Sequence, residues 1–188
     1  MRAINITGKH NIDQLKKIGD EKYKAERKHM TDLDETMTTH KYQFDVIRHM
    51  YVNNESIYNQ GIHTLNEYNT SLFYKELTHK IQGYKGQDIK KDIHDKDSLI
   101  NIEHVLEKLV AGKMSCCYCS NAILVLYKNV REPMQWTLDR LDNDMSHTNE
   151  NTCISCLKCN LQRRVMNVDK FTFTKKLKIN KLYIIFMQ

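Results

Sequence analysis

Cys116-Cys-Tyr-Cys119 and Cys156-Leu-Lys-Cys159 are the two short stretches of this 188-residue chain that decide its fold. Each pairs two cysteines across two residues, and 36 residues separate Cys119 from Cys156. A Cys-x-x-Cys turn points two sulfur atoms at one centre, so two turns supply the four tetrahedral ligands that structural zinc prefers. The spacing predicts a zinc site formed by Cys116, Cys119, Cys156 and Cys159. Two matched turns in one short segment make ordinary thiols the weaker interpretation.

The residues around these turns predict the local structure. A short strand is expected from Gln135 to Leu138, with Trp136 in the core, and an extended piece is expected after Asn151 up to Ile154. A helix should run from about Cys156 through Arg164. A further strand is expected over 123–127, and we interpret Cys117 and Cys153 as small buried side chains, with Cys117 as a substitute ligand.

The clearest helix precedes the cysteines. Its apolar residues follow the i, i+3, i+4, i+7, i+8 pattern, with Asn101 as N-cap and Gly112 as C-terminal stop; they are Ile102, Val105, Leu106, Leu109 and Val110.

The first hundred residues have no Pro or Cys and indicate helices joined by polar loops. Two amphipathic helices are predicted from apolar residues at helical spacing. The stretch 12–30 is highly charged and predicts a marginal helix, and 82–88 predicts an exposed loop that faces water or touches a phosphate. The apolar residues are Phe44, Ile47 and Tyr51 in the first amphipathic helix and Phe73, Leu77 and Ile81 in the second.

Together these elements predict an α+β fold in three parts. Residues 1–97 form a mainly helical region, residues 98–170 a zinc-stabilised module with its preceding helix, and residues 171–188 a basic and aromatic tail. The N-terminal helices are candidates for gripping DNA, for forming a homodimer or for docking in a larger assembly.

Composition limits the function classes. With 40% hydrophobic and 28% charged residues the chain can bury a core. It has no apolar run near the ~20 residues of a membrane span and no signal-peptide core, so we expect no membrane association and an intracellular location, in cytoplasm or nucleus. Abundant Asn, Lys, Ile and Tyr with one Pro is typical of an AT-rich genome, such as that of a large DNA virus.

The net charge of +6 favours a polyanionic partner. From Arg163 onward the chain carries seven Lys and Arg residues against one acid, with Phe171, Phe173 and Tyr183 interleaved. This pattern suits contact with a nucleic-acid backbone, and it equally suits a solvated basic tail whose aromatic residues pack on the core.

The segment 116–164 resembles the HNH endonucleases. The shared features are the two Cys-x-x-Cys pairs and the ending Asn151-Thr-Cys-Ile-Ser-Cys156-Leu-Lys-Cys159-Asn160-Leu-Gln-Arg163. Leu138-Asp-Arg-Leu-Asp-Asn143 and Ser146-His-Thr148 are similar to a subset of that family. The resemblance implies a hairpin and helix that clasp a catalytic metal, the ββα-metal fold, with DNA as substrate.

By the same resemblance, Asp139 and Asn160 would hold Mg²⁺ or Mn²⁺ through oxygen atoms, and Asn151 would tie the loop to the hairpin by hydrogen bonds. The zinc would be purely structural. Oxygen ligands and retained water are what Mg²⁺ prefers, and a bound metal relieves the charge that builds on a phosphodiester during hydrolysis.

Arg140 departs from the family pattern, because it stands where a His normally abstracts a proton from water. Arginine stays protonated and cannot be a base. Either His147 supplies the base, or Arg140 clamps the phosphate in a slow nuclease, or catalysis is lost. Structural interpretations also stand: Asp139 and Asp142 as turn caps, and His147 as a hydrogen-bonding residue of the hairpin.

Two function classes therefore remain. One is a metal-dependent HNH-type endonuclease that cuts DNA. The other is a zinc-stabilised nucleic-acid-binding or assembly protein whose HNH scaffold is catalytically weak or inactive.

Overall fold

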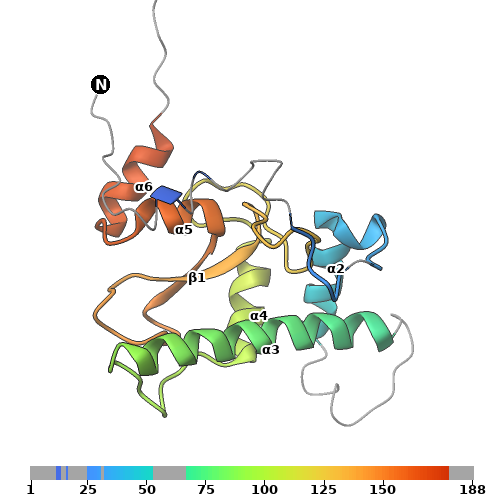
Figure 1. Cartoon of the computed structure of the whole chain (residues 1–188), viewed down its shortest axis with the longest axis horizontal. Helices are drawn as coiled ribbons and strands as arrows, with labels where there is room; N and C mark the ends of the chain where they lie inside the picture. Colours follow the sequence, from blue (N-terminus) through green and yellow to red (C-terminus); the bar gives the residue numbers. More distant parts are fainter. Residues whose placement is uncertain (1–11, 14–15, 17–24, 31, 53–66, 178–188) are drawn as a thin grey trace, which may run out of the picture.

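The computed structural model describes residues 12–13, 16, 25–30, 32–52 and 67–177 (Figure 1). The prediction for 12–30 falls largely outside these residues, as do Lys178, Lys181 and Tyr183 of the predicted tail. Helices precede and follow one small two-stranded sheet, which is an α+β arrangement. In order, the elements are η2 (Thr36–Thr38), α2 (His40–Val52), α3 (Glu67–Lys90), α4 (Ile102–Ala111), β1 (Trp136–Arg140), β2 (Thr152–Cys156), α5 (Leu157–Arg163) and α6 (Val168–Lys176).

The antiparallel hairpin β1–β2 organises the C-terminal half. Its register pairs Trp136 with Cys156 at one end and Arg140 with Thr152 at the other. Because side chains alternate along a strand, Trp136, Leu138 and Arg140 face one side and Thr137 and Asp139 the other. Helix α5 follows β2 directly, so strand, strand and helix come in the predicted order.

Helix α3 covers one face of this hairpin and α5 lies on the other (Figure 1). The hydroxyl of Tyr84 on α3 accepts a hydrogen bond from the Leu138 backbone N at 2.9 Å. The α3 residues Phe73, Leu77, Ile81 and Tyr84 are buried, and Asp88 is fully buried.

The expectation of an exposed loop at 82–88 was therefore wrong. The buried positions 73, 77, 81, 84 and 88 recur every three or four residues, which is the helical period, and α3 continues through them to Lys90. Gly83 and Gly86 lie where an added Cβ would meet nothing within 4 Å. They are tolerated in the helix because they face away from the packed stripe.

The predicted strand over 123–127 was also wrong, although the segment is buried. Gln43 on α2 takes the place of a partner strand: its Oε1 accepts from the backbone N of Val125 and Leu126 at 2.8 and 3.0 Å, and its Nε2 donates to Leu126 O at 2.8 Å. A buried glutamine with all these bonds satisfies backbone groups that would otherwise be costly to bury.

Helix α4 forms as predicted. The Asn101 side chain accepts a hydrogen bond from the His104 backbone N at 2.9 Å, and Gly112 ends the helix. Its buried residues Val105, Leu106 and Leu109 face inward, and Lys108 Nζ donates to Thr152 O of β2 at 3.1 Å.

One hydrophobic core contains residues from all three predicted parts. It extends from Met30 through Ile47, Phe73 and Leu109 to Phe171. The predicted boundary at residue 170 falls inside α6, whose Phe171 stacks edge-on against Tyr118 at 4.9 Å. Among the described helices, none is long and apolar enough to cross a membrane.

Candidate metal centre and active site

The four predicted cysteines meet at one point beside the hairpin. The sulfur atoms of Cys116, Cys119, Cys156 and Cys159 all lie within 4.8 Å of one another, and those of Cys119 and Cys156 are 3.9 Å apart. Three of the four residues are buried and Cys119 is half-buried. Four sulfur ligands in a buried cluster of this size suit a tetrahedral metal ion such as zinc.

Local backbone features form each half of the cluster. In the first half Ser120 N donates to Cys116 O at 2.9 Å, and Ser120 adopts a left-handed φ of 59° that closes the turn. In the second half Cys156 ends β2 and caps α5, where its sulfur accepts from the Cys159 backbone N at 3.4 Å. The strand-to-helix junction therefore sets the second pair of sulfur atoms.

The thiols of the cluster control one another's ionisation. Hydrogen bonds from neighbouring thiols, first of all Cys117, lower the pKa of Cys116, and the contact with Cys116 raises the pKa of Cys156 to about 12. The first cause of both shifts is hydrogen bonding, because a thiol that donates to an ionised neighbour keeps its own proton; repulsion between like charges adds to this at Cys156. A divalent cation at the centre would offset the negative charge and allow all four to ionise.

Asp139 is held on the α5 face of the hairpin by two partners. Arg163 donates from Nε to Oδ2 at 2.6 Å and from Nη2 to Oδ1 at 2.7 Å, and the Tyr118 hydroxyl donates to Oδ2 at 2.7 Å. This bidentate pair is buried, with side-chain exposures of 1% for Arg163 and 5% for Asp139. Burial alone would lower the pKa of Arg163, but the bonds to Asp139 outweigh it and raise that pKa.

Asn160 lies on the same face, in the middle of α5. Its Nδ2 donates to Thr137 Oγ1 at 3.1 Å and to Leu138 O at 3.2 Å. These two acceptors fix the orientation of the amide, since only the nitrogen can donate. No described residue donates to Asn160 Oδ1, so this oxygen remains available as a ligand.

Asn151 fastens the loop between the strands, with hydrogen bonds of the kind predicted for it. Its Nδ2 donates to Asp142 O and Ser146 O at 2.9 and 3.0 Å, and its Oδ1 accepts from the Asp142 backbone N at 2.8 Å. The Asp142 carboxylate makes a local turn by accepting from Asp144 N at 2.9 Å, which is the capping interpretation of that residue.

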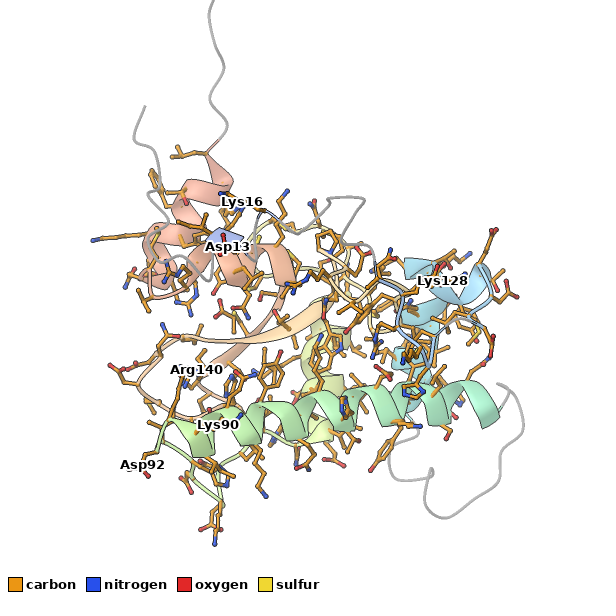
Figure 2. All side chains as sticks on the ribbon, viewed as in Figure 1. Asp13, Lys16, Lys90, Asp92, Lys128 and Arg140 are labelled. Carbon is orange, nitrogen blue, oxygen red and sulfur yellow. The ribbon has the colours of Figure 1, made fainter. Side chains whose placement is uncertain are left out.

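Arg140 and His147 lie on the opposite, α3 face, where both meet Asp88. The Asp88 carboxylate accepts from the backbone N of His147 at 2.8 Å and lies 2.7 Å from His147 Nδ1. Arg140 Nη1 is 3.6 Å from the same carboxylate and donates to Met145 O at 3.0 Å. Figure 2 shows Arg140 at the loop end of the hairpin, near the C-terminal end of α3.

The imidazole of His147 is held in a dry and neutral state. Desolvation lowers its pKa, and the neighbouring Arg140 and Lys91 act in the same direction, while Asp88 opposes them. The Tyr84 ring lies 4.7 Å away and covers one side of it. With Nδ1 bound to Asp88, the lone pair of a neutral ring falls on Nε2, for which no described residue is a hydrogen-bond partner.

The comparisons with known proteins gave no match: no family model, no curated protein and no solved structure is significantly similar to this chain. The HNH resemblance therefore remains a resemblance of motifs.

The structure corrects several sequence interpretations around this site. Arg163 is buried against Asp139 and is not part of an exposed basic tail. Cys117 is exposed and not buried, and Cys153 is half-buried. Trp136 lies in the core as predicted.

Three residues of the site were missed. Tyr118 lies between two ligand cysteines, and Tyr84 and Asp88 lie in the segment that we expected to be a loop. The helical period from Phe73 to Ile81 was the signal available for Tyr84 and Asp88, because its extension reaches both positions.

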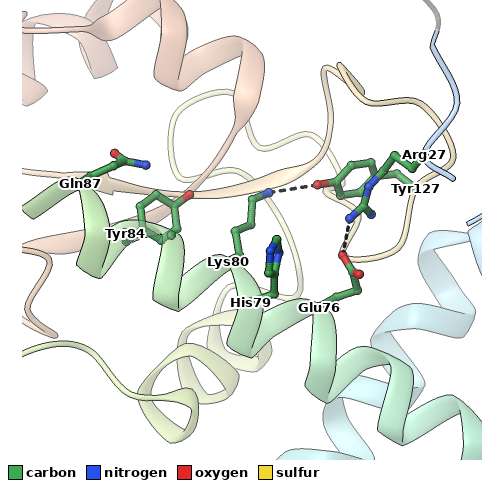
Figure 3. A pocket seen from close by; sticks show the side chains of 8 residues that line it. Arg27, Glu76, His79, Lys80, Tyr84, Gln87 and Tyr127 are labelled. Carbon is green, nitrogen blue, oxygen red and sulfur yellow. Dashed lines mark hydrogen bonds and ion pairs between the residues drawn. The ribbon is translucent and has the colours of Figure 1, made fainter. Parts of the chain in front are cut away.

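A hollow of about 250 Å³ lies along α3, lined by residues that include Arg27, Lys80 and Tyr127 (Figure 3). Its cations are already paired: Arg27 Nη2 lies 2.7 Å from Glu76 Oε2, and Lys80 Nζ donates to Trp136 O and to Gln135 Oε1. Lys80 thereby ties α3 to the start of β1. We interpret this hollow as part of the framework.

Proposed function

We propose that this protein is an HNH-type endonuclease that hydrolyses DNA phosphodiester bonds with one divalent metal ion, and that zinc bound by the four cysteines is structural. The observation that carries the proposal is the position of Asn160 and Asp139. Both lie on the α5 face of a strand–strand–helix unit, next to the cysteine cluster, and Asn160 directs an unpaired oxygen away from its anchored nitrogen.

The donor set fits a hard cation. Amide and carboxylate oxygens are the ligands that Mg²⁺ and Mn²⁺ accept. Arg163 and Tyr118 together use three acceptor positions of Asp139, two on Oδ2 and one on Oδ1, so Oδ1 keeps a lone pair. Asp139 Oδ1 and Asn160 Oδ1 would hold the ion, which would neutralise charge on the phosphate when bound.

His147 has the chemistry of a base, although it lies on the α3 face of the hairpin while Asp139 and Asn160 lie on the α5 face. Asp88 fixes its Nδ1, burial keeps the ring neutral, and Nε2 is left as the basic atom. Because Arg140 and His147 share the carboxylate of Asp88, the imidazole lies beside the position at which the family pattern has its histidine. The cations of α6 would contact the phosphate backbone, whereas Arg140 is buried and paired with Asp88.

The second candidate is a zinc-stabilised DNA-binding or assembly protein that does not cut. One observation favours it: the guanidinium of Arg163 already occupies the cation position at Asp139, on two bonds of 2.6 and 2.7 Å. A charge satisfied in this way attracts a second cation weakly.

A nicking assay separates these candidates. The full chain, purified with zinc, is incubated with supercoiled plasmid and Mg²⁺ or Mn²⁺, beside Asn160→Ala and a matched control, Lys158→Ala, at an exposed position of the same helix. Nicking that Lys158→Ala retains and Asn160→Ala reduces by about 100-fold or more supports the nuclease. Plasmid binding without nicking by the wild type supports the second candidate. A wild type that neither nicks nor binds the plasmid overturns both candidates.

The role of His147 needs a separate measurement. Asp88→Asn keeps the size of the side chain but removes the charge that orients the imidazole, so the rate should fall by about 10–100-fold and its dependence on pH should shift. Asp92→Asn, at an exposed position two residues beyond the end of α3, is the matched control. An unchanged pH–rate profile in Asp88→Asn would show that His147 is not the base.

A further inference from the structure

Cys117 and Cys153 are the two cysteines that the four-sulfur cluster does not use. Their sulfur atoms lie 3.0 Å apart. The backbones are also adjacent, because Cys117 N donates to Ile154 O at 2.9 Å. A disulfide bond is about 2.05 Å long, so a displacement of about 1 Å in two flexible side chains would join them.

Cys117 is more accessible than any cysteine of the cluster. It is exposed, whereas Cys116, Cys156 and Cys159 are buried and Cys119, like Cys153, is half-buried. An oxidant in solution therefore meets Cys117 first and finds its resolving partner already in contact.

We propose that Cys117 and Cys153 form an oxidation site, in which hydrogen peroxide converts the two thiols into a disulfide. The sulfur of Cys117 attacks one peroxide oxygen, the O–O bond breaks, and a sulfenic acid and one molecule of water form. The sulfur of Cys153 then attacks that of Cys117, the S–O bond breaks, and a second water leaves. Two thiols are oxidised, one peroxide is reduced and the protons end in water.

The position of this pair gives the disulfide a structural consequence. Cys117 belongs to the turn that carries Cys116 and Cys119, and Cys153 belongs to β2, which ends at Cys156. The disulfide would therefore join the same two segments that the four-cysteine cluster joins. It would keep the two halves of the metal site together while the metal is absent, so the four ligands would be preorganised for rebinding.

The same reaction would change one contact of the candidate active site. The Cys153 thiol donates to the Tyr118 hydroxyl at 3.6 Å, and that hydroxyl donates to Asp139. In the disulfide Cys153 has no proton to donate, while the bond from Tyr118 to Asp139 remains. We therefore expect oxidation to affect metal retention more than the position of Asp139.

The test uses the full chain purified with zinc under reducing conditions and then treated with a slight excess of hydrogen peroxide. Intact mass should fall by two hydrogen atoms, and peptide mapping should find Cys117 linked to Cys153. Cys117→Ser and Cys153→Ser should each prevent that loss. A disulfide within the four-cysteine cluster, or overoxidation of Cys117 without a link to Cys153, would overturn the proposal.

Metal release gives a second and independent measurement. With excess chelator and a zinc-sensitive dye, release from the oxidised wild type should be about tenfold slower than from the reduced protein, and oxidised Cys153→Ser should behave like the reduced protein. Equal release from linked and unlinked protein would refute the structural consequence. Neither readout depends on nuclease activity, so the proposed function and this inference can fail separately.

Discussion

The two faces of the β1–β2 hairpin are built in different ways, although Asp139 and Arg140 are neighbours in the sequence. On the α5 face, Asp139 is held by partners 21 and 24 residues away, Tyr118 and Arg163. On the α3 face, Leu138 and His147 are held by partners 54 and 59 residues away, Tyr84 and Asp88. One face is a local unit and the other depends on long-range packing.

The two faces therefore differ in what can organise them. The local face contains the cysteine cluster and the oxygens of Asp139 and Asn160, so a metal ion can organise it. The long-range face contains a histidine that helix α3 keeps dry and oriented. If both faces serve one reaction, the hairpin is the element through which they are aligned.

The largest expected effect comes from breaking the local face at Cys156. Structural zinc supplies about 10–16 kcal/mol of apparent folding free energy in small zinc domains, as much as the whole stability of an ordinary domain. Cys156→Ser should therefore abolish stoichiometric metal binding and remove hydrogen-exchange protection from residues 136–163. The amides of α3 should keep more of their protection.

The matched control for this variant is Cys117→Ser, a thiol of the same knuckle that lies outside the four-cysteine cluster. It should bind one metal ion and keep the protection pattern of the wild type. If the hairpin amides of Cys156→Ser are protected from hydrogen exchange as well as those of the wild type, packing alone builds the α5 face. The contrast between the two faces would then be wrong.

A smaller effect is expected from Arg163→Met, which leaves the Asp139 carboxylate buried without its cation. Removal of one partner of a buried ion pair costs about 3–5 kcal/mol, and the free energy of unfolding in urea, measured at constant zinc, should fall by that amount. Lys170→Met, at an exposed position of α6, is the control and should change the stability by less than about 0.5 kcal/mol.

The double variant Asp139→Asn with Arg163→Met sharpens this test. Because it leaves no unpaired charge in the site, it should recover part of the loss seen with Arg163→Met alone. A loss as large as the sum of both single variants would mean that Asp139 and Arg163 do not act as a pair.

The same division explains what could be predicted from the sequence. The four-cysteine cluster, α4 and the strand–strand–helix order depend on spacing within a few tens of residues, and the structure has the four sulfur atoms and these elements where they were expected. The cap at Asn101 is visible in the sequence because it depends only on the four residues from Asn101 to His104.

The misses involve contacts that no local pattern contains. Gln43 replaces a partner strand for 125–126, and Asp88 meets His147 from 59 residues away. Arg163 looks like the start of a basic tail in the sequence, and only the turn of α5 reveals that it faces Asp139. Polar residues at buried positions were the common error, because composition alone places them on the surface.

The smallest expected effect concerns the long-range face and its response to pH. Desolvation lowers the pKa of His147 in the folded protein, so between that value and the unfolded value of about 6.5 the unfolded chain binds more protons. The free energy of unfolding must then rise with pH across this window. His147→Gln removes the contribution, so the wild type should lose more stability than the variant as pH falls from 7 to 5.5, by less than about 1.4 kcal/mol per unit of pKa shift.

Urea titrations at each pH with zinc in excess measure the difference, since loss of metal in acid affects both proteins. Parallel curves would mean that α3 does not keep His147 neutral and that only the α5 face is organised for chemistry.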